Sequence, residues 1–417
     1  MTDQINTPEL RFPNYKDSWF SYKLNDISER VTRKNKNLES QRPLTISGQL
    51  GLIDQIEYFN KSVSSKNLTG YTLIKKGEFA YNKSYSNGYP LGAIKKLERY
   101  DLGILSSLYI CFSFNKNIDK NFMKNYFEST KWYREVANIA VEGARNHGLL
   151  NIPVNDFFNI NINLPIQYEQ EKIGNFFSKL DRQIELEEKK LELLEQQKRG
   201  YMQKIFTQEL KFKNSQLENI KWSYKTLEEL NSFFTDGNYG ESYPKSEDMS
   251  DKNDGVAFLR GSNLKKGRIT LEDANYISKK KHSELTTGHL FLDDIVIAVR
   301  GSLGAVGYVN ENMVGNNINS QLAIIRTSDS LLYGKYLLYY LMSNQGKKEL
   351  LSRVTGTALK QLPIKQIKQI KVPVPKLYEQ HKIANFLSEL DNLIDNQTEK
   401  IELLKERNKG FLQKMFV

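Results

Sequence analysis

The chain contains one long segment twice. Tyr168 to Phe206 reads YEQEKIGNFFSKLDRQIELEEKKLELLEQQKRGYMQKIF, and Tyr378 to Phe416 aligns with it without a gap, 210 residues later. The residue is identical at 19 of the 39 aligned positions. Agreement of this kind indicates an internal duplication, so the fold has to contain the same element twice.

Both copies have the spacing of a long helix with one apolar stripe, because apolar residues recur at alternating steps of four and three. Acidic residues lead the first turns and basic residues crowd the last, as the helix dipole favours. A helix of about 38 residues would be roughly 57 Å long. We expect the two stripes to form a helix-pair interface through Ile173, Phe177, Leu180, Ile184, Leu191, Leu194 and Tyr201, together with Ile383, Leu387, Leu390, Ile394, Ile401, Leu404 and Phe411.

Polar residues interrupt the stripe at equivalent positions in the two copies. Glu187 corresponds to Gln397, and Lys198 corresponds to Asn408. Polar residues on such a seam fix the register of the helices rather than add stability. The repeat therefore predicts a helix pair with one defined register.

The duplication extends beyond the helices. LNIPVNDFFNININLP, which ends at Pro165, lines up with KQLPIKQIKQIKVPVP, which ends at Pro375. Alternating apolar residues before a proline predict a strand that leads into each helix. Fainter likenesses link LGAIKKL with LGAVGYV, SSLYICF with SQLAIIR, and Trp19 with Trp222. The chain is thus two copies of one unit, each a globular part of about 150 residues followed by a long helix.

The positive charge of the chain lies outside the repeated helices. The formal net charge is +11, and the two helical segments have net charges of 0 and −1, so the remainder has +12. Basic loops such as VTRKNKN, NKSYSNGYP, FLRGSNLKKGR and AVRGSLGAVG occur in both globular parts. This distribution points to a polyanionic partner that the globular parts bind.

Motifs for catalysis or metal binding are missing from the sequence. The four histidines are scattered without cysteine pairs, so no zinc-type spacing occurs. There is no glycine-rich nucleotide-binding motif, and Asp293 and Asp294 fit a turn that enters a strand better than a nuclease site. We predict no catalytic and no metal-binding residue in this chain.

Cysteine usage and hydropathy indicate the compartment. Cys111, the single cysteine, stands in the apolar stretch SSLYICFSF and is predicted to be a buried, inert thiol. The start MTDQINTPEL has no signal-peptide pattern, and no apolar run approaches a membrane span. We expect a cytoplasmic protein that does not bind a membrane.

Two basic, divergent half-length domains, each ended by a helix with the pattern YEQ.KI..F...LD..I, resemble the specificity subunit of type I restriction-modification enzymes. The resemblance covers nearly the whole chain. It implies an α+β fold with two pseudo-symmetric target recognition domains of mixed α/β content. A long helix would follow each domain, and the two helices would pack as an antiparallel coiled coil.

The resemblance also divides the chain into four segments. Residues 8–167 and 213–377 would be the target recognition domains, and residues 168–212 and 378–417 the conserved helical spacers. An antiparallel pair has a two-fold axis across it and would present the two domains in opposite orientations, which suits the dyad of a DNA duplex. Each domain would read one half of a split site, and helix length would act as a ruler between the halves.

The resemblance implies partners that supply the chemistry. Modification subunits would hold S-adenosylmethionine and methylate adenine, and restriction subunits would use ATP with Mg²⁺ to cut double-stranded DNA. No cofactor is expected in this chain itself. Because its two target domains differ in their loops, the two half-sites should differ as well.

The resemblance supplies no shared base-reading motif, so candidate contacts come from composition. Lys and Arg neutralise phosphates, while Arg, Asn and Ser can hydrogen-bond to base edges. In the first domain the predicted DNA-binding residues are Lys83, Ser84, Tyr85, Asn87, Arg145, Asn146 and His147. In the second they are Arg260, Ser262, Asn263, Arg300 and Ser302.

Two other functions remain open at this point. The chain could be a coiled-coil assembly protein whose basic charge is incidental. It could also be a restriction enzyme fused to its own DNA reader, although the missing motifs count against that.

Overall fold

The computed structural model describes residues 6–61, 63–86, 88–140, 150–212, 221–357 and 359–417. It contains two compact units, one formed by Met1–Glu188 with Glu399–Val417 and the other by Lys189–Thr398. Each unit therefore includes a globular part and a stretch of both long helices. The four segments predicted from the sequence place the globular parts and the long helices in separate segments. The compact units instead combine each globular part with parts of both helices.

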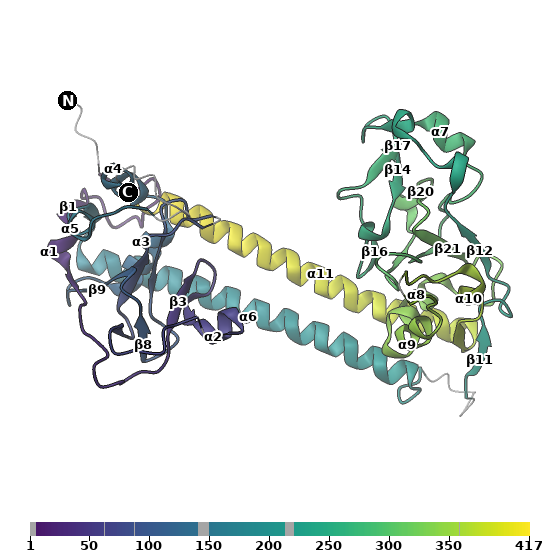
Figure 1. Ribbon diagram of the computed structural model, residues 1–417, viewed down its shortest axis with the longest axis horizontal. Helices are drawn as coiled ribbons and strands as arrows, with labels where there is room; N and C mark the ends of the chain where they lie inside the picture. Colours follow the sequence, from purple (N-terminus) through teal and green to yellow (C-terminus); the bar gives the residue numbers. More distant parts are fainter. Residues whose placement is uncertain (1–5, 62, 87, 141–149, 213–220, 358) are drawn as a thin grey trace. The chain divides into compact units, whose positions relative to one another are not determined.

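The first unit carries a mixed α/β domain (Figure 1). Its elements before the long helix are β1 (Phe20–Lys23), α1 (Leu24–Ile27), β2 (Ser28–Arg30), β3 (Leu44–Ser47), β4 (Gly51–Asp54), α2 (Gln55–Phe59), β5 (Thr72–Lys75), β6 (Phe79–Asn82), β7 (Ala93–Lys96), β8 (Leu102–Leu105), β9 (Tyr109–Phe114), α3 (Lys120–Glu128), α4 (Tyr133–Ile139), α5 (Val154–Phe158) and β10 (Asn161–Leu164). An aromatic core that includes Phe79, Phe112 and Trp132 lies beneath its sheet.

The second unit carries a larger domain of the same kind. Its elements are β11 (Ser223–Thr226), β12 (Phe233–Asp236), η1 (Gly240–Ser242), η2 (Ser246–Asp248), β13 (Met249–Ser250), β14 (Val256–Leu259), η3 (Gly261–Asn263), β15 (Leu264–Lys265), β16 (Gly267–Ile269), β17 (Asn275–Ile277), α7 (Lys279–Glu284), β18 (Ile295–Ala298), β19 (Val306–Tyr308), η4 (Glu311–Met313), β20 (Asn317–Ile318), β21 (Leu322–Arg326), α8 (Gly334–Met342), α9 (Asn344–Ser352), α10 (Ile364–Lys368) and β22 (Lys371–Val374).

Both domains are built on the same four antiparallel strands. The order β2-β9-β6-β7 in the first unit recurs as β12-β21-β18-β19 in the second, where β16 and β15 extend the sheet. The central register pairs Phe79 with Phe112 in one sheet and Ile295 with Ile325 in the other. The helices α3 and α8 follow the sheets at corresponding points of the chain. The predicted pseudo-symmetry of two α/β domains is confirmed.

A strand leads into each long helix, as the sequence predicts. β10 pairs with β1 and ends just before Pro165, while β22 pairs with β11 and ends just before Pro375. The earlier part of each stretch is a short helix instead of strand. Pro153 and Pro363 are the N-caps of α5 and α10, and each has an extended backbone at the point where its helix begins.

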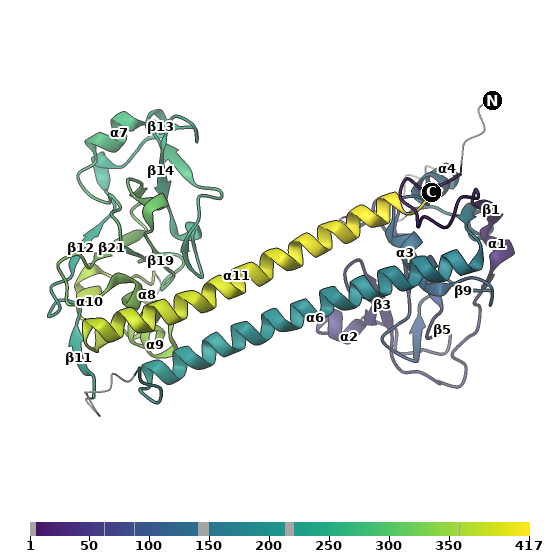
Figure 2. The ribbon, with the colours of Figure 1, turned by 180° about the vertical axis from the view of Figure 1, so that it is seen from behind.

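The long helices are α6 (Gln167–Phe206) and α11 (Leu377–Lys414), and they run antiparallel within each unit (Figures 1 and 2). In the first unit the rings of Phe176 and Phe411 are 5.2 Å apart, and Glu188 binds Lys405 at 2.6 Å. Later residues of α6 therefore contact earlier residues of α11, as in an antiparallel pair. In the second unit Lys198 binds Asp391 at 2.5 Å, and Tyr201 packs on Phe386.

The stripe serves the domain cores as well as the helix pair. Ile173 and Phe177 belong to the core of the first domain, and Ile383 and Leu387 to that of the second. Of the remaining stripe residues, Ile184, Ile401 and Leu404 are buried, Tyr201 is exposed, and the following are half-buried: Leu180, Leu191, Leu194, Leu390, Ile394 and Phe411. The ends of the stripe are thus covered by the globular parts.

The repeated glutamine of the YEQ pattern ties each helix to its domain. Gln170 donates to the Pro165 carbonyl at 2.9 Å and accepts from the Asp119 N–H, the N-cap of α3, at 3.0 Å. Gln380 makes the same two contacts, with the Pro375 carbonyl at 3.0 Å and the N–H of the residue that caps α8 at 2.8 Å. Because these amides are buried, losing a partner would leave a costly unsatisfied group.

Candidate nucleic-acid interface

Each domain presents one hairpin loop at an equivalent place in its sheet. Residues 83–92 connect β6 to β7 in the first unit, and residues 299–305 connect β18 to β19 in the second. The predicted residues Lys83, Ser84, Tyr85 and Asn87 fall in the first of these loops, and Arg300 and Ser302 fall in the second. The two loops end in the stretches LGA of residues 91–93 and 303–305, which the internal repeat also aligns.

The same backbone contact fixes the base of both loops. The Leu150 N–H donates to the Lys83 carbonyl at 2.9 Å, and the Leu362 N–H donates to the Val299 carbonyl at 3.0 Å. Each loop therefore lies against the segment that leads into α5 or α10. This attachment holds the start of each loop.

In the first loop one predicted side chain is well exposed. Tyr85 is 62% exposed, whereas Ser84 and Lys83 are half-buried. The Lys83 ammonium donates to the Ile152 carbonyl at 3.5 Å, and the Ser84 N–H donates to Asn82. The other predicted residues of this domain, Asn87, Arg145, Asn146 and His147, lie outside the described residues.

In the second domain, three predicted side chains are exposed and two of their loops adjoin. Arg300, Ser302 and Ser262 are all exposed. A Cβ added at Gly261 would lie 3.6 Å from the Ser302 hydroxyl, so the η3 turn and the β18-β19 loop are neighbours. The two turns carry an exposed guanidinium and two exposed hydroxyls, groups that are able to contact phosphates or base edges.

Two predicted residues of the second domain have structural roles. Asn263 is fully buried, accepts from the Arg260 N–H at 3.0 Å, and donates to the carbonyls of Thr270 and Glu272. The Arg260 guanidinium donates to the Asp273 carbonyl at 2.9 Å. The amide of Asn263 is thus used inside the domain and does not face a partner.

Sequence reasoning missed Tyr239, which follows β12. Its ring lies 5.6 Å from the Arg300 guanidinium, and its hydroxyl donates to the Ser320 carbonyl at 3.1 Å. Partial burial raises the pKa of Tyr239, so the phenol stays neutral. The ring supports the arginine from one side, which restricts where the cation can point. An aromatic among turn residues, in the stretch DGNYGESYP, was the available signal.

The described residues contain no cluster of three or more His, Cys, Asp or Glu side chains that could hold a metal ion.

Asp293 and Asp294 directly precede β18, as predicted for a turn entering a strand. Asp294 is buried and binds the Arg326 guanidinium at 2.9 and 2.8 Å. In the part of the chain that the structure describes, no helix is long and apolar enough to span a membrane.

Comparison with known proteins gives one consistent result. The model of the type I restriction modification DNA specificity domain matches residues 219–406. The type I restriction enzyme MjaVIII specificity subunit of Methanocaldococcus jannaschii is 28% identical over 331 residues, which cover 73% of this chain and 72% of that protein.

Solved structures share the fold. The type I restriction-modification S subunit from M. genitalium superposes with a TM-score of 0.56 at 17% identity and covers 99% of both chains. A chain from a study of complex assembly and conformational transition of the type I restriction-modification system has a TM-score of 0.58 at 19% identity, covering 95% of this chain and 97% of its own.

The duplicated fold defines a protein of two related domains, each with one equivalent loop and each followed by a long helix. In sequence, the chain is similar to the specificity subunits of type I restriction-modification systems. Neither the assembly protein nor the fused restriction enzyme gains support from these comparisons.

Proposed function

We propose that this chain reads an asymmetric split DNA site, one half with each target recognition domain. The observation that carries the proposal is the pair of equivalent hairpin loops. Residues 83–92 and 299–305 connect corresponding strands in the sheets of the two domains, but the loops differ in length and in amino-acid sequence. Equivalent placement gives both domains one way to approach DNA, and different side chains give the two half-sites different sequences.

The exposed side chains suit two kinds of contact with DNA, one to base edges and one to phosphates. Arg300, steadied by Tyr239, suits the acceptors of a guanine edge or a phosphate, and Ser302 with Ser262 adds hydroxyl donors. Tyr85 offers an exposed ring and a phenol in the first domain. The net charge of +12 outside the helical segments would draw the domains to the DNA backbone.

The proposed chain is a non-catalytic subunit. Modification subunits with S-adenosylmethionine would methylate adenine, and restriction subunits with ATP and Mg²⁺ would cut DNA. A flipped adenine has to enter a separate active site, so a reader without its own catalytic groups suits this division of work. We place the complex in the cytoplasm, where its DNA substrate lies.

The central prediction concerns the methylated sequence. In a host that carries this chain with its modification subunits, mapping of methylated adenines should give one motif of two different short half-sites separated by unspecified bases. Deleting the gene for this chain alone should remove the motif, which is the matched control. A continuous motif, or methylation that persists without this chain, would overturn the proposal.

A second measurement separates the alternatives. The purified chain alone should neither methylate nor cleave DNA, and catalysis by the chain alone would favour the fused enzyme. With modification subunits present, selection from a random DNA library should enrich the split motif. An unenriched library would favour the assembly protein.

A further inference from the structure

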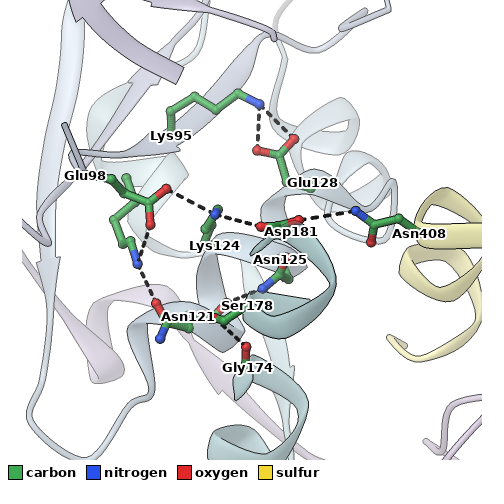
Figure 3. A network of polar contacts seen from close by, with 11 residues as sticks. Lys95, Glu98, Asn121, Lys124, Asn125, Glu128, Gly174, Ser178, Asp181 and Asn408 are labelled. Atoms are coloured by element: carbon green, nitrogen blue, oxygen red, sulfur yellow. Dashed lines mark hydrogen bonds and ion pairs between the residues drawn. The ribbon is translucent and has the colours of Figure 1, made fainter. Parts of the chain in front are cut away.

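One aspartate of the first unit connects three helices. Asp181 of α6 accepts from the Lys124 ammonium of α3 at 3.0 Å through one carboxylate oxygen, and from the Asn408 amide of α11 at 3.3 Å through the other (Figure 3). A single carboxylate thus joins the target domain to both long helices.

The second unit repeats this arrangement 210 residues later. Asp391 of α11 accepts from the Tyr339 hydroxyl of α8 at 2.7 Å through one oxygen, and from the Lys198 ammonium of α6 at 2.5 Å through the other. α8 is the counterpart of α3, and Lys198 is the counterpart of Asn408. The duplicated aspartate contacts the same two neighbours in both units.

The chemistry of the two sites differs although their geometry agrees. Each aspartate receives one cation, which comes from the target domain as Lys124 in the first unit and from the opposite helix as Lys198 in the second. Lys124 also binds Glu98 at 3.1 Å. Burial alone would lower the pKa of Lys124, but attraction from Asp181 and Glu98 leaves that pKa raised, so the ammonium stays charged. The charged anchor of the first domain is therefore permanent at neutral pH.

Helix α3 is also connected to the hairpin loop between β6 and β7. One turn after Lys124, the Glu128 carboxylate of α3 binds the buried Lys95 ammonium at 2.6 and 2.7 Å (Figure 3). Lys95 donates to the Tyr89 hydroxyl at 3.2 Å, and Tyr89 donates to the Gly48 carbonyl at 2.8 Å. Tyr89 belongs to the β6-β7 loop. α3 thus binds the long helices directly and is connected to the loop through Lys95.

A second attachment restricts α3 to one orientation. Its capping residue, Asp119, is hydrogen-bonded to Gln170. Gly174 of α6 lies so close that an added Cβ would be 2.4 Å from the Asp119 carboxylate. The contacts at Gln170 and Gly174, on successive turns of α6, fix the position of the N-terminus of α3. The ion pair between Lys124 and Asp181 is a third point of attachment, which resists rotation of α3 about its N-terminus.

We propose that Lys124 and Asp181 are positioning residues that fix the orientation of the first target domain on the long helices, and thereby the distance between half-sites that the chain accepts. This inference rests on the proposed function. Without the ion pair, α3 keeps its N-terminal attachment and the packing of Phe122 and Tyr126 on Phe416, but it loses its polar link to α6 at Lys124 and can shift there. The loop should then reach half-sites at neighbouring distances while it reads the same bases.

The test uses the complex of this chain with its modification subunits. Duplexes carry both mapped half-sites at the mapped distance, or one base pair closer or farther apart. Lys124→Met should raise the ratio of methylation rates, off-distance over mapped distance, by about fivefold, on the scale of a lost ion pair. Lys124→Arg should stay near the wild-type ratio. Asp181→Asn, which keeps the shape of the side chain, should change the ratio in the same direction as Lys124→Met.

Lys76→Met is the matched control, because Lys76 makes an exposed ion pair with Asp101 in the same domain. It should leave the ratio unchanged. Equal slowing on all three duplexes by both Lys124→Met and Asp181→Asn would reveal a merely structural role and overturn the inference. If Lys124→Met does not fold, Asp181→Asn decides. A wild-type complex that methylates no split site would overturn the proposed function, and the inference with it.

Discussion

Gly174 and Ala384 occupy equivalent positions in the two long helices, and the difference between them reflects how closely each helix meets its domain. Ala384 is fully buried. At Gly174 a Cβ would lie 2.4 Å from the Asp119 carboxylate and 2.9 Å from the Phe122 nitrogen. The close packing of α3 on α6 in the first unit therefore requires glycine at position 174.

Gly174→Ala should destabilise the first unit although alanine is the better helix former. The overlap with α3 should cost about 1–3 kcal/mol, against a gain of about 1 kcal/mol in helix propensity. The matched control is Gly200→Ala in the same helix, where nothing lies within 4 Å. Thermal unfolding should show a lower midpoint for the first variant and an equal or higher one for the second. A stabilised Gly174→Ala protein would contradict the close packing.

Single residues were predictable where type and burial agree. Cys111 is buried, and burial raises its pKa to about 12, as expected of an inert thiol. Asn263 was not predictable, because an asparagine in a basic loop looks the same in sequence whether its amide faces solvent or caps a turn. Tyr239 depends on its contact with Arg300, which lies 61 positions away in the sequence.

At the scale of elements, the long helices and the strands before them followed from the repeat, since each pattern was present twice. The sequence predicts strand where the short helices α5 and α10 lie, because five mixed apolar and polar residues after a proline suit either structure. The contacts of Gln170 and Gln380 with the caps of α3 and α8 were also beyond prediction. Duplication marks such residues as special without naming their partners.

The two hairpin loops should act separately. Arg300→Ala should reduce methylation of sites with the preferred base at one position of the second half-site, by the roughly 1–3 kcal/mol that a good side-chain contact to a base contributes to discrimination. Preference at the first half-site is the internal control. Methylation assays on duplexes with single base changes in each half give the result. Loss of preference in both halves would show that the domains do not read independently.

At the scale of the whole molecule, charge is divided between the two kinds of segment. The helical repeats are close to neutral, and the rest of the chain has a net charge of +12. Ion pairs such as Glu188 with Lys405 balance charges along the helices. The excess that could meet DNA phosphates is thus carried by the globular domains.

Binding of the complex to its split site should weaken steeply with salt. If it neutralises about 6–10 phosphates, affinity should fall about 10³- to 10⁵-fold between 50 and 200 mM salt. Titrations of labelled duplex at several salt concentrations give the slope, and a duplex with scrambled half-sites serves as the control. A flat response would mean that the basic charge is incidental, as in an assembly protein.

The different origin of the cation at Asp181 and Asp391 sets a rule for building chimeras. A first domain grafted from a relative brings its own α3, so it must supply a cation where Lys124 stands, or Asp181 is left uncompensated. A grafted second domain finds Asp391 already paired with the recipient's Lys198, but it must supply a cation where Arg268 binds Asp395 of α11. The residue that a foreign domain has to match therefore differs between the two halves of the chain: it is Lys124 in the first half and Arg268 in the second.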